Sequence, residues 1–270
     1  MVSAATSLQN RRTGRERRAV ADRAVAVELD RALARGEIEV LFQPQYAARN
    51  DRLVGAEALA RWRRPGAGLV GGEKLFALAA RAGRVTAVSR HLARAAMIAG
   101  ANWPGSLRLS LNVTAADLAS ADFAEQLRET IAEVGFQPER LTIEITEQSL
   151  VDVQGGAIPQ LEELAERGVH IALDDFGSGF CNFSYLKRLP MHALKLDRSM
   201  VDGIAENPRD LAVLRGIVAM SAALGLKVVA EGVESEAQLA VLRAEGCDHY
   251  QGFLRAAPLS AERFAALSTG

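Results

Sequence analysis

Oxygen-bearing side chains recur along this chain at the points where apolar segments end. They are Glu57, Asn112, Glu144, Asp174, Asp175, Glu231 and Gln251. Carboxylate and amide oxygens are the ligands that Mg²⁺ and Mn²⁺ prefer in proteins, whereas zinc favours histidine and cysteine. The chain has 4 histidines, and they stand at isolated positions without metal-binding spacing. The pattern therefore predicts a divalent metal site with oxygen ligands.

The adjacent pair Asp174 and Asp175 is the most specific of these signals. Two neighbouring carboxylates repel each other, and burying both without cations is costly. Two divalent ions would remove that cost, with one aspartate shared between them. Such a pair of ions is suited to hydrolysis of a phosphodiester, because both ions stabilise the attacking and leaving oxygens. The alternative is a helix N-cap with a charged neighbour, but the other oxygen ligands favour the metal site.

Two cationic side chains fit the same chemistry. Lys195 ends an apolar segment, where it would orient or deprotonate a water molecule or balance the carboxylate charge. Its alternative role is a structural ion pair with Asp197. Arg61 shares the side of its strand with Glu57 under two-residue alternation, so it is suited to bind a phosphate group. These residues indicate a metal-dependent phosphoester hydrolase and do not name its substrate.

Glu147 and Glu234 are ambiguous at this level. Each lies three residues after a predicted ligand, Glu144 and Glu231 respectively, and that spacing places two side chains on one face of a helical turn. Each glutamate would either support the ligand before it or stand at a helix start, where the helix dipole favours an acid.

The bulk properties are those of an ordinary globular protein. The chain has 270 residues and a formal net charge of −1, so no global basic field indicates a nucleic-acid polymer or an anionic membrane as partner. No apolar run approaches the roughly 20 residues that span a bilayer. Its 2 cysteines lie far apart, and no secretory signal is recognisable, so we expect reduced thiols and a cytoplasmic location.

The segments that carry these residues alternate between apolar strands and amphipathic helices. Strands are predicted near 38–44, 53–62, 107–113, 141–145, 170–173, 193–196, 227–230 and 248–250. Helices are predicted at 73–81, 88–98, 123–134, 158–166, 209–224 and 236–245, several of them followed by glycine. Alternation over this length closes most simply as a barrel, in which active-site groups follow the strands.

One connection departs from a regular barrel. Residues 47–51 are too few for a helical crossover, so the first two strands should run antiparallel. The predicted fold class is therefore α/β, a modified (β/α)8 TIM-type barrel with its first strand antiparallel. Residues 1–23 are rich in arginine and are predicted to be a basic N-terminal linker or the start of a helix. Residues 24–270 are predicted to form the one barrel domain.

The ordered series of motifs resembles the EAL-domain cyclic di-GMP phosphodiesterases of bacteria. After the opening Gln43-Pro44, the series is Glu57-Ala58-Leu59, Asn112, Glu144-Ile145-Thr146-Glu147, Asp174-Asp175-Phe176-Gly177, Leu194-Lys195-Leu196-Asp197, Glu231-Gly232-Val233-Glu234 and Gln251-Gly252-Phe253. It extends from about residue 25 to residue 268. Any one motif is weak evidence, but the order makes the resemblance specific.

The resemblance implies hydrolysis of one phosphodiester of cyclic di-GMP to linear 5′-pGpG with two Mg²⁺ or Mn²⁺ ions. One ion would be bound by Glu57, Asn112, Glu144 and Asp174, and the other by Asp174, Asp175 and Glu231. Lys195 would assist the water, so that Lys195, Glu57, Asp174 and Asp175 form the catalytic set. On the substrate side would lie Gln43, Leu59, Arg61 and Gln251. The remaining acids that surround the site would be Glu147, Asp197 and Glu234.

The resemblance also implies how such a site is regulated. Residues 176–183 look like a regulatory loop anchored by Glu147 that couples a homodimer to metal binding, and Cys181 lies inside it. We interpret Cys181 as a small apolar filler, with redox control as the minority hypothesis. An upstream sensory or cyclase domain is the expected partner in a longer chain. The alternatives are a cyclic di-GMP receptor without hydrolytic activity, and a barrel enzyme that abstracts a proton from a carbon acid.

Overall fold

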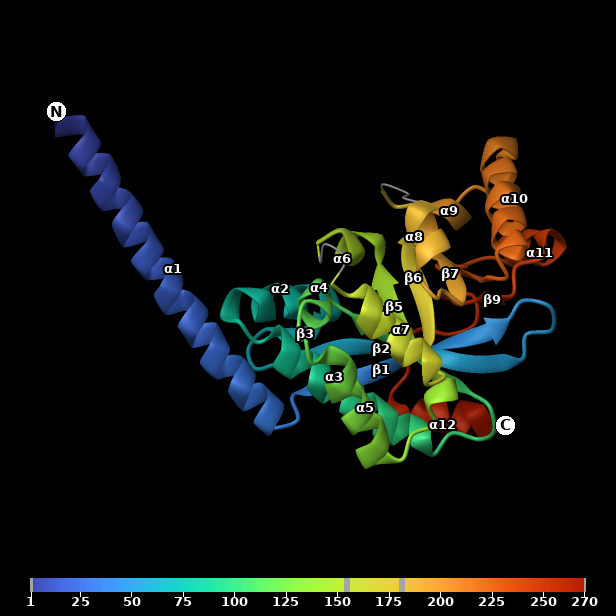
Figure 1. Cartoon of the computed structure of the whole chain (residues 1–270), viewed down its shortest axis with the longest axis horizontal. Coiled ribbons are helices and arrows are strands. Elements are labelled where there is room, and N and C mark those ends of the chain that lie inside the picture. The colour runs from blue at the N-terminus through green and yellow to red at the C-terminus, as the bar shows by residue number, and fades with distance from the viewer. Residues whose placement is uncertain (1, 153–155, 180–182, 270) are drawn as a thin grey trace. The chain divides into compact units, whose positions relative to one another are not determined.

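The computed structural model describes residues 2–152, 156–179 and 183–269 (Figure 1). The chain divides into two compact units, one made of Met1–Glu39 and Ala60–Leu92 and the other of Val40–Leu59 and Ala93–Gly270. Each unit has its own strands and helices.

The larger unit is built on a closed ring of strands. They are β1 (Ile38–Ala47), β2 (Leu53–Arg64), β4 (Arg108–Val113), β5 (Leu141–Thr146), β6 (His170–Phe176), β7 (Ala193–Leu196), β8 (Lys227–Ala230) and β9 (His249–Tyr250). Their order is β1-β9-β8-β7-β6-β5-β4-β2, and pairing of β1 with β2 closes the ring. All neighbours from β2 through β9 are parallel, whereas β1 is antiparallel to β9. The predicted modified barrel with an antiparallel first strand is confirmed.

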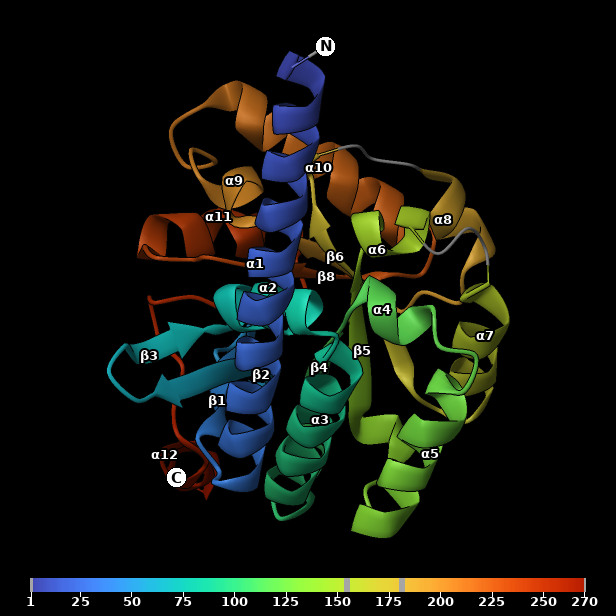
Figure 2. The same cartoon turned by 90° about the vertical axis from the view of Figure 1, so that its left-hand side faces the viewer.

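Helices follow the parallel strands and cover the outside of the barrel (Figure 2). They are α3 (Val85–Ala101), α4 (Ala115–Leu118), α5 (Phe123–Val134), η1 (Pro138–Arg140), α6 (Glu147–Asp152), α7 (Ile158–Glu166), α8 (Phe183–Arg188), α9 (Arg198–Val201), α10 (Pro208–Ala223), α11 (Glu236–Glu245) and α12 (Ala261–Thr269). Local chemistry explains their ends. Ser235 and Gln238 form a capping box that starts α11, and Gly246 ends it in the left-handed conformation.

Strand β5 shows how a strand places its polar and apolar residues on opposite faces. In β5, Leu141, Ile143 and Ile145 are fully buried and belong to the apolar core beneath the helices. The residues between them, Thr142 and Glu144, line a cavity inside the barrel. Because successive side chains point to opposite faces of a strand, the helix layer receives the apolar set and the barrel interior receives the polar one.

The smaller unit contains α1 (Val2–Ala34), β3 (Gly68–Gly71) and α2 (Gly72–Ala82), together with the end of β2. β3 pairs antiparallel with Arg61–Arg64. Arg64 forms a bidentate ion pair with Glu28 of α1, at 2.7 Å for both contacts. α1 is one continuous helix (Figure 1), and the boundary predicted at residue 23 falls inside it. The single domain over residues 24–270 stays a prediction.

In the part of the chain that the structure describes, no helix is both long enough and apolar enough to cross a membrane.

Close approach of β2 to β4 in the larger unit requires glycine at position 55. A Cβ on Gly55 would collide with the backbone carbonyl of Arg108. We expect Gly55→Ala to destabilise the protein by about 1–3 kcal/mol, the cost typical of overpacking. Chemical denaturation monitored by circular dichroism measures this loss.

Gly216→Ala is the matched control. Gly216 lies on an exposed position of α10, and a Cβ there would meet nothing within 4 Å. Alanine in a helix interior is favoured over glycine by roughly 0.5–1 kcal/mol, so this variant should unfold at higher denaturant concentration. Equal stability of the two variants would contradict the close approach at Gly55.

Candidate metal centre

The oxygen ligands predicted from the sequence lie at one end of the barrel in the larger unit. Glu57 belongs to β2, and three further side chains, Asn112, Glu144 and Asp174, stand at or near the ends of β4, β5 and β6. Two more, Glu231 and Gln251, directly follow β8 and β9. Because these strands are parallel, their carboxyl ends meet at one mouth, which is where (β/α)8 barrels place catalytic groups.

Lys195 of β7 is the centre of this cluster. Its Nζ lies 2.6 Å from Glu144 Oε2, 3.0 Å from Asp174 Oδ1, 2.6 Å from Glu231 Oε1 and 3.5 Å from Glu57 Oε2. Only 1% of its side chain is exposed, so these carboxylates rather than water solvate the ammonium group. The neighbouring Leu194 and Leu196 are fully buried on the opposite face of the strand and hold its backbone in place.

Two amide side chains donate hydrogen bonds to the carboxylates, and a third orients one of these amides. Asn112 Nδ2 donates to Glu57 Oε1 at 2.7 Å, and Gln251 Nε2 donates to Glu57 Oε2 at 2.6 Å and to Glu231 Oε1 at 3.1 Å. Gln45 Nε2 of β1 in turn donates to Gln251 Oε1 at 3.0 Å and fixes its orientation. Sequence reasoning missed Gln45; its two-residue spacing from the predicted Gln43 could have revealed it.

The electrostatics of the cluster are strongly unbalanced. Four carboxylates face one ammonium group, which leaves a formal charge of −3 if all are ionised. Burial raises the pKa of Glu144, and the three other carboxylates add to this against the effect of Lys195. Burial likewise raises the pKa of Glu231 to about 8. For Glu57, burial is outweighed by Lys195 and by the amides, and its pKa is lowered.

This imbalance is what divalent cations would correct. Oxygens of Glu57, Glu144 and Asp174 all lie within 4.8 Å of one another, and the three residues are buried. Carboxylate oxygens brought together in this way suit a hard ion such as Mg²⁺ or Mn²⁺. The donor set therefore fits the predicted metal.

A bulge positions the second aspartate. Between Leu173 and Phe176 the pairing of β6 with β7 shifts register, so one extra residue interrupts the alternation. Asp175 adopts a left-handed backbone with φ of 56°, and its N–H donates to Asp174 Oδ1 at 2.9 Å. Burial and then Asp174 raise the pKa of Asp175, and the Lys195 charge acts against them. Asp175 is exposed, and among the described residues the close group of ligand oxygens consists of Glu57, Glu144 and Asp174 without it.

The three acids predicted to surround the site are Asp197, Glu234 and Glu147. Asp197 accepts hydrogen bonds from the N–H and hydroxyl of Ser199 and caps α9, so it does not form the ion pair with Lys195 that was the structural alternative. Glu234 is exposed and binds Arg198 at 2.8 Å. Glu147 begins α6 directly after β5.

The residues predicted to contact the substrate do not all belong to the carboxylate cluster. Gln43 is buried, and its Nε2 donates to the carbonyl of Ala256 at 2.6 Å rather than to a carboxylate of the cluster. Leu59 lies near the end of the β2 segment in the larger unit. Arg61 belongs to the smaller unit, where it donates to the carbonyl of Ala60 at 2.8 Å. Cys181 lies outside the described residues.

The profile of the EAL domain family matches residues 26–258. The chain belongs to the EAL domain family. A similar relative is the cyclic di-GMP phosphodiesterase NbdA of Pseudomonas aeruginosa, which is 37% identical over 86% of this chain and 30% of its own length. The bifunctional diguanylate cyclase/cyclic di-GMP phosphodiesterase MucR of the same organism is 34% identical over 88% of this chain and 36% of its own length. The EAL chain described here therefore spans about a third of the length of these relatives.

Solved EAL structures share the fold. The structure of the PaMucR phosphodiesterase in complex with c-di-GMP has a TM-score of 0.82 and 33% sequence identity, over 89% of this chain and 99% of that one. The EAL enzyme Bd1971, in its form with cAMP and cyclic di-GMP bound, has a TM-score of 0.86 and 26% identity, over 97% of this chain and 73% of that one. The family predicted from the sequence is thus confirmed.

The raised pKa of Glu231 predicts how stability depends on pH without metal. A carboxyl group whose pKa rises from 4.5 to about 8 on folding stabilises the fold fully below pH 4.5, and this contribution is lost as pH rises through about 8. In EDTA, we therefore expect the free energy of unfolding to fall between about pH 5 and pH 8. Urea titrations across this range measure the slope.

Glu231→Gln should flatten this slope, because the amide does not titrate. Glu163→Gln is the control, since Glu163 is an exposed residue of α7 that pairs with Arg167. An unchanged slope in Glu231→Gln would contradict the assignment of the titration to Glu231. Mg²⁺ should reduce the slope in the unaltered protein, since a cation stabilises the ionised carboxylates.

Proposed function

We propose that this EAL domain hydrolyses one phosphodiester bond of cyclic di-GMP to linear 5′-pGpG with the aid of divalent ions. The observation that carries the proposal is the buried group of carboxylates around Lys195 at the carboxyl mouth of the barrel. Family membership supports it, because the relatives NbdA and MucR are named as cyclic di-GMP phosphodiesterases.

Two Mg²⁺ or Mn²⁺ ions are the proposed cofactors. Glu57, Asn112, Glu144 and Asp174 would hold one ion, and Asp174, Asp175 and Glu231 would hold the other. When bound, the ions lower the pKa of water and stabilise the attacking and leaving oxygens of the phosphodiester. The bulge between Leu173 and Phe176 supports the second site, since it interrupts the regular alternation that would point the two side chains to opposite faces.

Lys195 has an orienting and electrostatic role in this proposal. Burial disfavours its charged form, but the surrounding carboxylates dominate and raise the pKa of Nζ well above 10.5. In this arrangement the protonated group would donate a hydrogen bond to the reacting water or to a phosphate oxygen.

Gln251 and Gln45 keep the ligands in position. Gln251 bridges Glu57 of β2 and Glu231, which follows β8. In the closed ring, β9 and β1 lie between these two strands. Such a bridge limits rotation of both carboxylates and favours a defined ligand geometry. Glu147 and Glu234 are proposed to support the ligands that precede them, Glu144 and Glu231, from the loops beyond β5 and β8.

Recognition of the substrate is proposed for Gln43, Leu59, Arg61 and Gln251. Arg61 carries a guanidinium group that can bind a phosphate oxygen pair, and Leu59 offers an apolar contact for a base. A homodimer, a cytoplasmic location and an upstream sensory or cyclase domain complete the proposal. The relative MucR, named as a bifunctional cyclase and phosphodiesterase, supports the last of these, since this chain spans 36% of it.

The decisive experiment incubates the purified chain with cyclic di-GMP and Mg²⁺, with and without EDTA, and separates the nucleotides by chromatography. We expect pGpG to accumulate only with the metal. Glu57→Gln keeps the shape of the side chain but removes its charge. It should lower kcat by about 1000-fold, because a lost ligand removes several kcal/mol of charge stabilisation at the transition state.

Glu163→Gln again serves as the control and should retain full activity, because this exposed side chain pairs with Arg167, the residue that directly follows α7. Turnover at the unaltered rate in Glu57→Gln would disprove the metal assignment. Tight binding of cyclic di-GMP without product in the unaltered protein would instead identify a receptor.

A further inference from the structure

The amino ends of the barrel strands carry a second set of chemically active side chains. Arg108, His170, Lys227 and His249 are the first residues of β4, β6, β8 and β9, and His192 directly precedes β7. This end of the barrel is opposite to the mouth that holds the carboxylates. In (β/α)8 barrels this end serves stability rather than catalysis, so a ring of nitrogen-bearing side chains there requires its own explanation.

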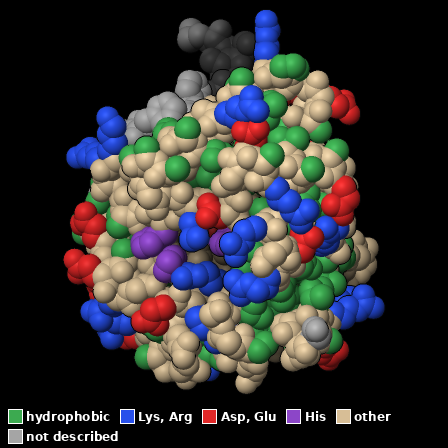
Figure 3. All heavy atoms as spheres, turned by 90° about the vertical axis from the view of Figure 1, so that its right-hand side faces the viewer, with side chains coloured by type: hydrophobic (Ala, Val, Ile, Leu, Met, Phe, Trp, Pro, Cys, Tyr) green, Lys and Arg blue, Asp and Glu red, His purple; other side chains and the backbone are tan. Residues whose placement is uncertain are grey.

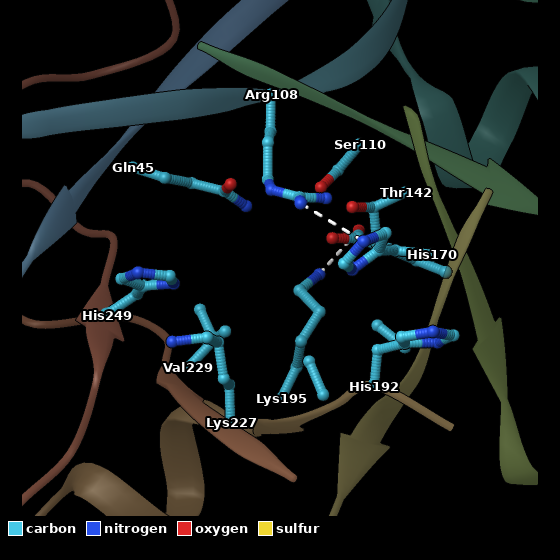
Figure 4. Close-up of a pocket in the computed structure, with 13 residues that line it drawn as sticks. Gln45, Arg108, Ser110, Thr142, His170, His192, Lys195, Lys227, Val229 and His249 are labelled. Carbon is cyan, nitrogen blue, oxygen red and sulfur yellow. Dashed lines mark hydrogen bonds and ion pairs between the residues drawn. The ribbon is translucent and has the colours of Figure 1, made fainter. Parts of the chain in front are cut away.

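The ring surrounds a cavity of about 90 Å³ (Figure 4). Ser110 and Thr142 line its middle, and Glu144 and Lys195 form its inner end. Ala172, Ala193 and Val229 add apolar lining, and the space is large enough for several water molecules or one small oxyanion. On the surface, histidine side chains gather beside lysine and arginine side chains around this opening (Figure 3).

The hydrogen bonds of the Arg108 guanidinium group indicate what kind of ligand the cavity favours. One of its guanidinium nitrogens, Nη2, lies 3.1 Å from His170 Nε2, and because a guanidinium can only donate, this histidine nitrogen accepts. The other nitrogen, Nη1, is buried, and among the described residues it has no hydrogen-bond partner. A buried donor of a charged group without an acceptor is costly, which indicates a missing acceptor at this position.

Burial and the surrounding positive charge lower the pKa values of the three histidines. Burial and then Arg108 lower the pKa of His170 to about 4. Burial also lowers the pKa of His192 and His249, with Arg108 and, for His249, Lys227 adding to the effect. Neutral imidazoles beside fixed cations create a site that offers N–H donors and a positive field together.

The cavity does not have the properties of a metal site. Within the described residues, close grouping of three ligand atoms of the metal-binding kind is found at Glu57, Glu144 and Asp174, and not at the histidines. The neighbouring Arg108 and Lys227 would also repel a cation. The field at this end therefore favours an anion.

Charge around the opening strengthens this preference. Lys227 is 60% exposed and pairs with Asp248 at 3.3 Å, while the other oxygen of Asp248 accepts from the N–H of Val228. Adjoining hollows share Lys227 and His249 with the cavity and add Arg49 and Arg52. Among the described residues, no carboxylate forms an ion pair with either of these arginines or with Arg108.

We propose that the opening of this cavity at the amino end of the barrel binds a phosphate group, at the opposite end of the cavity from Glu144 and Lys195, where the cavity borders the metal centre. Arg108 Nη1 supplies a buried charged donor, Lys227 supplies a second cation at the rim, and His249 contributes an imidazole wall. A phosphate oxygen would provide the acceptor that Nη1 otherwise lacks. This inference does not depend on the proposed hydrolysis, because it rests on residues at the other end of the barrel.

Histidine NMR of the full chain in EDTA tests the proposal, since EDTA prevents phosphate from binding through a divalent ion. The probes are inorganic phosphate and, in a second titration, the phosphomonoester GMP. Three of the 4 histidines line the cavity, and His91 lies in the smaller unit and serves as an internal reference. We expect saturable shifts of the C2–H resonances of His170, His192 and His249, and none for His91.

Two variants assign the binding. Arg108→Gln and Lys227→Gln should each weaken phosphate binding by about tenfold or more, because each loses a charge-assisted hydrogen bond. Arg167→Gln is the control, since Arg167 is exposed directly after α7 and pairs with Glu163. Lys227 is also exposed, so its variant remains informative if Arg108→Gln does not fold.

The two probes distinguish the source of the phosphate. Tighter binding of inorganic phosphate identifies a site for the free anion, and tighter binding of GMP identifies a site for a phosphate ester. Linear shifts without saturation, or equal shifts of all four histidines, would overturn the proposal. So would saturable binding that is unaffected in Lys227→Gln and in a folded Arg108→Gln, because the phosphate would then lie elsewhere.

Discussion

One buried ammonium group holds the carboxyl mouth of this barrel together. Lys195 is solvated by carboxylates that arrive from β2, β5, β6 and the segment after β8, so four parts of the chain converge on a single atom. Removing an ion from water costs several kcal/mol, and close opposite charges are what offset this cost. The arrangement keeps a concentrated negative charge in place while the strand ends remain packed.

The barrel can accommodate this charge because its large apolar side chains point mainly outwards. Leu109, Ile143, Ile171 and Leu194 are fully buried in the helix layer, whereas the apolar residues that line the interior cavity are the smaller Ala172, Ala193 and Val229. The hydrophobic stabilisation of the fold is thus generated outside the ring of strands. The interior is left free to carry carboxylates at one end and cations with imidazoles at the other.

Much of this arrangement can be predicted from the sequence, since strand ends are visible as the points where apolar runs stop. Glu57, Glu144, Asp174 and Lys195 were predicted in this way, and the short connection at residues 47–51 predicted the antiparallel first strand. The histidines were interpreted as isolated, because parallel strands bring residues together that lie far apart in the chain. The rings of His170 and His192 are tilted relative to each other with centres 4.4 Å apart, a proximity that depends on register and not on spacing.

The other differences also have physical causes. The helix from Val2 to Ala34 is a single element, although its composition alone leaves a linker open for its first part. The bulge at Asp174 and Asp175 requires a partner strand to define it, so adjacency in sequence indicates two carboxylates but not how both approach one mouth. Gln45 acts through Gln251, and a residue two contacts away from the carboxylates leaves little local signal.

The shortest strand of the closed ring is β9. β9 has two residues, and only Tyr46↔Tyr250 and Ala47↔His249 are in register across its antiparallel edge with β1. Local opening of a protein follows the regions with the fewest cooperative contacts, so this edge is the natural seam of the barrel. Gln251 and His249 flank that seam, one towards each mouth. Local opening of this edge would therefore displace residues at both ends of the barrel at the same time.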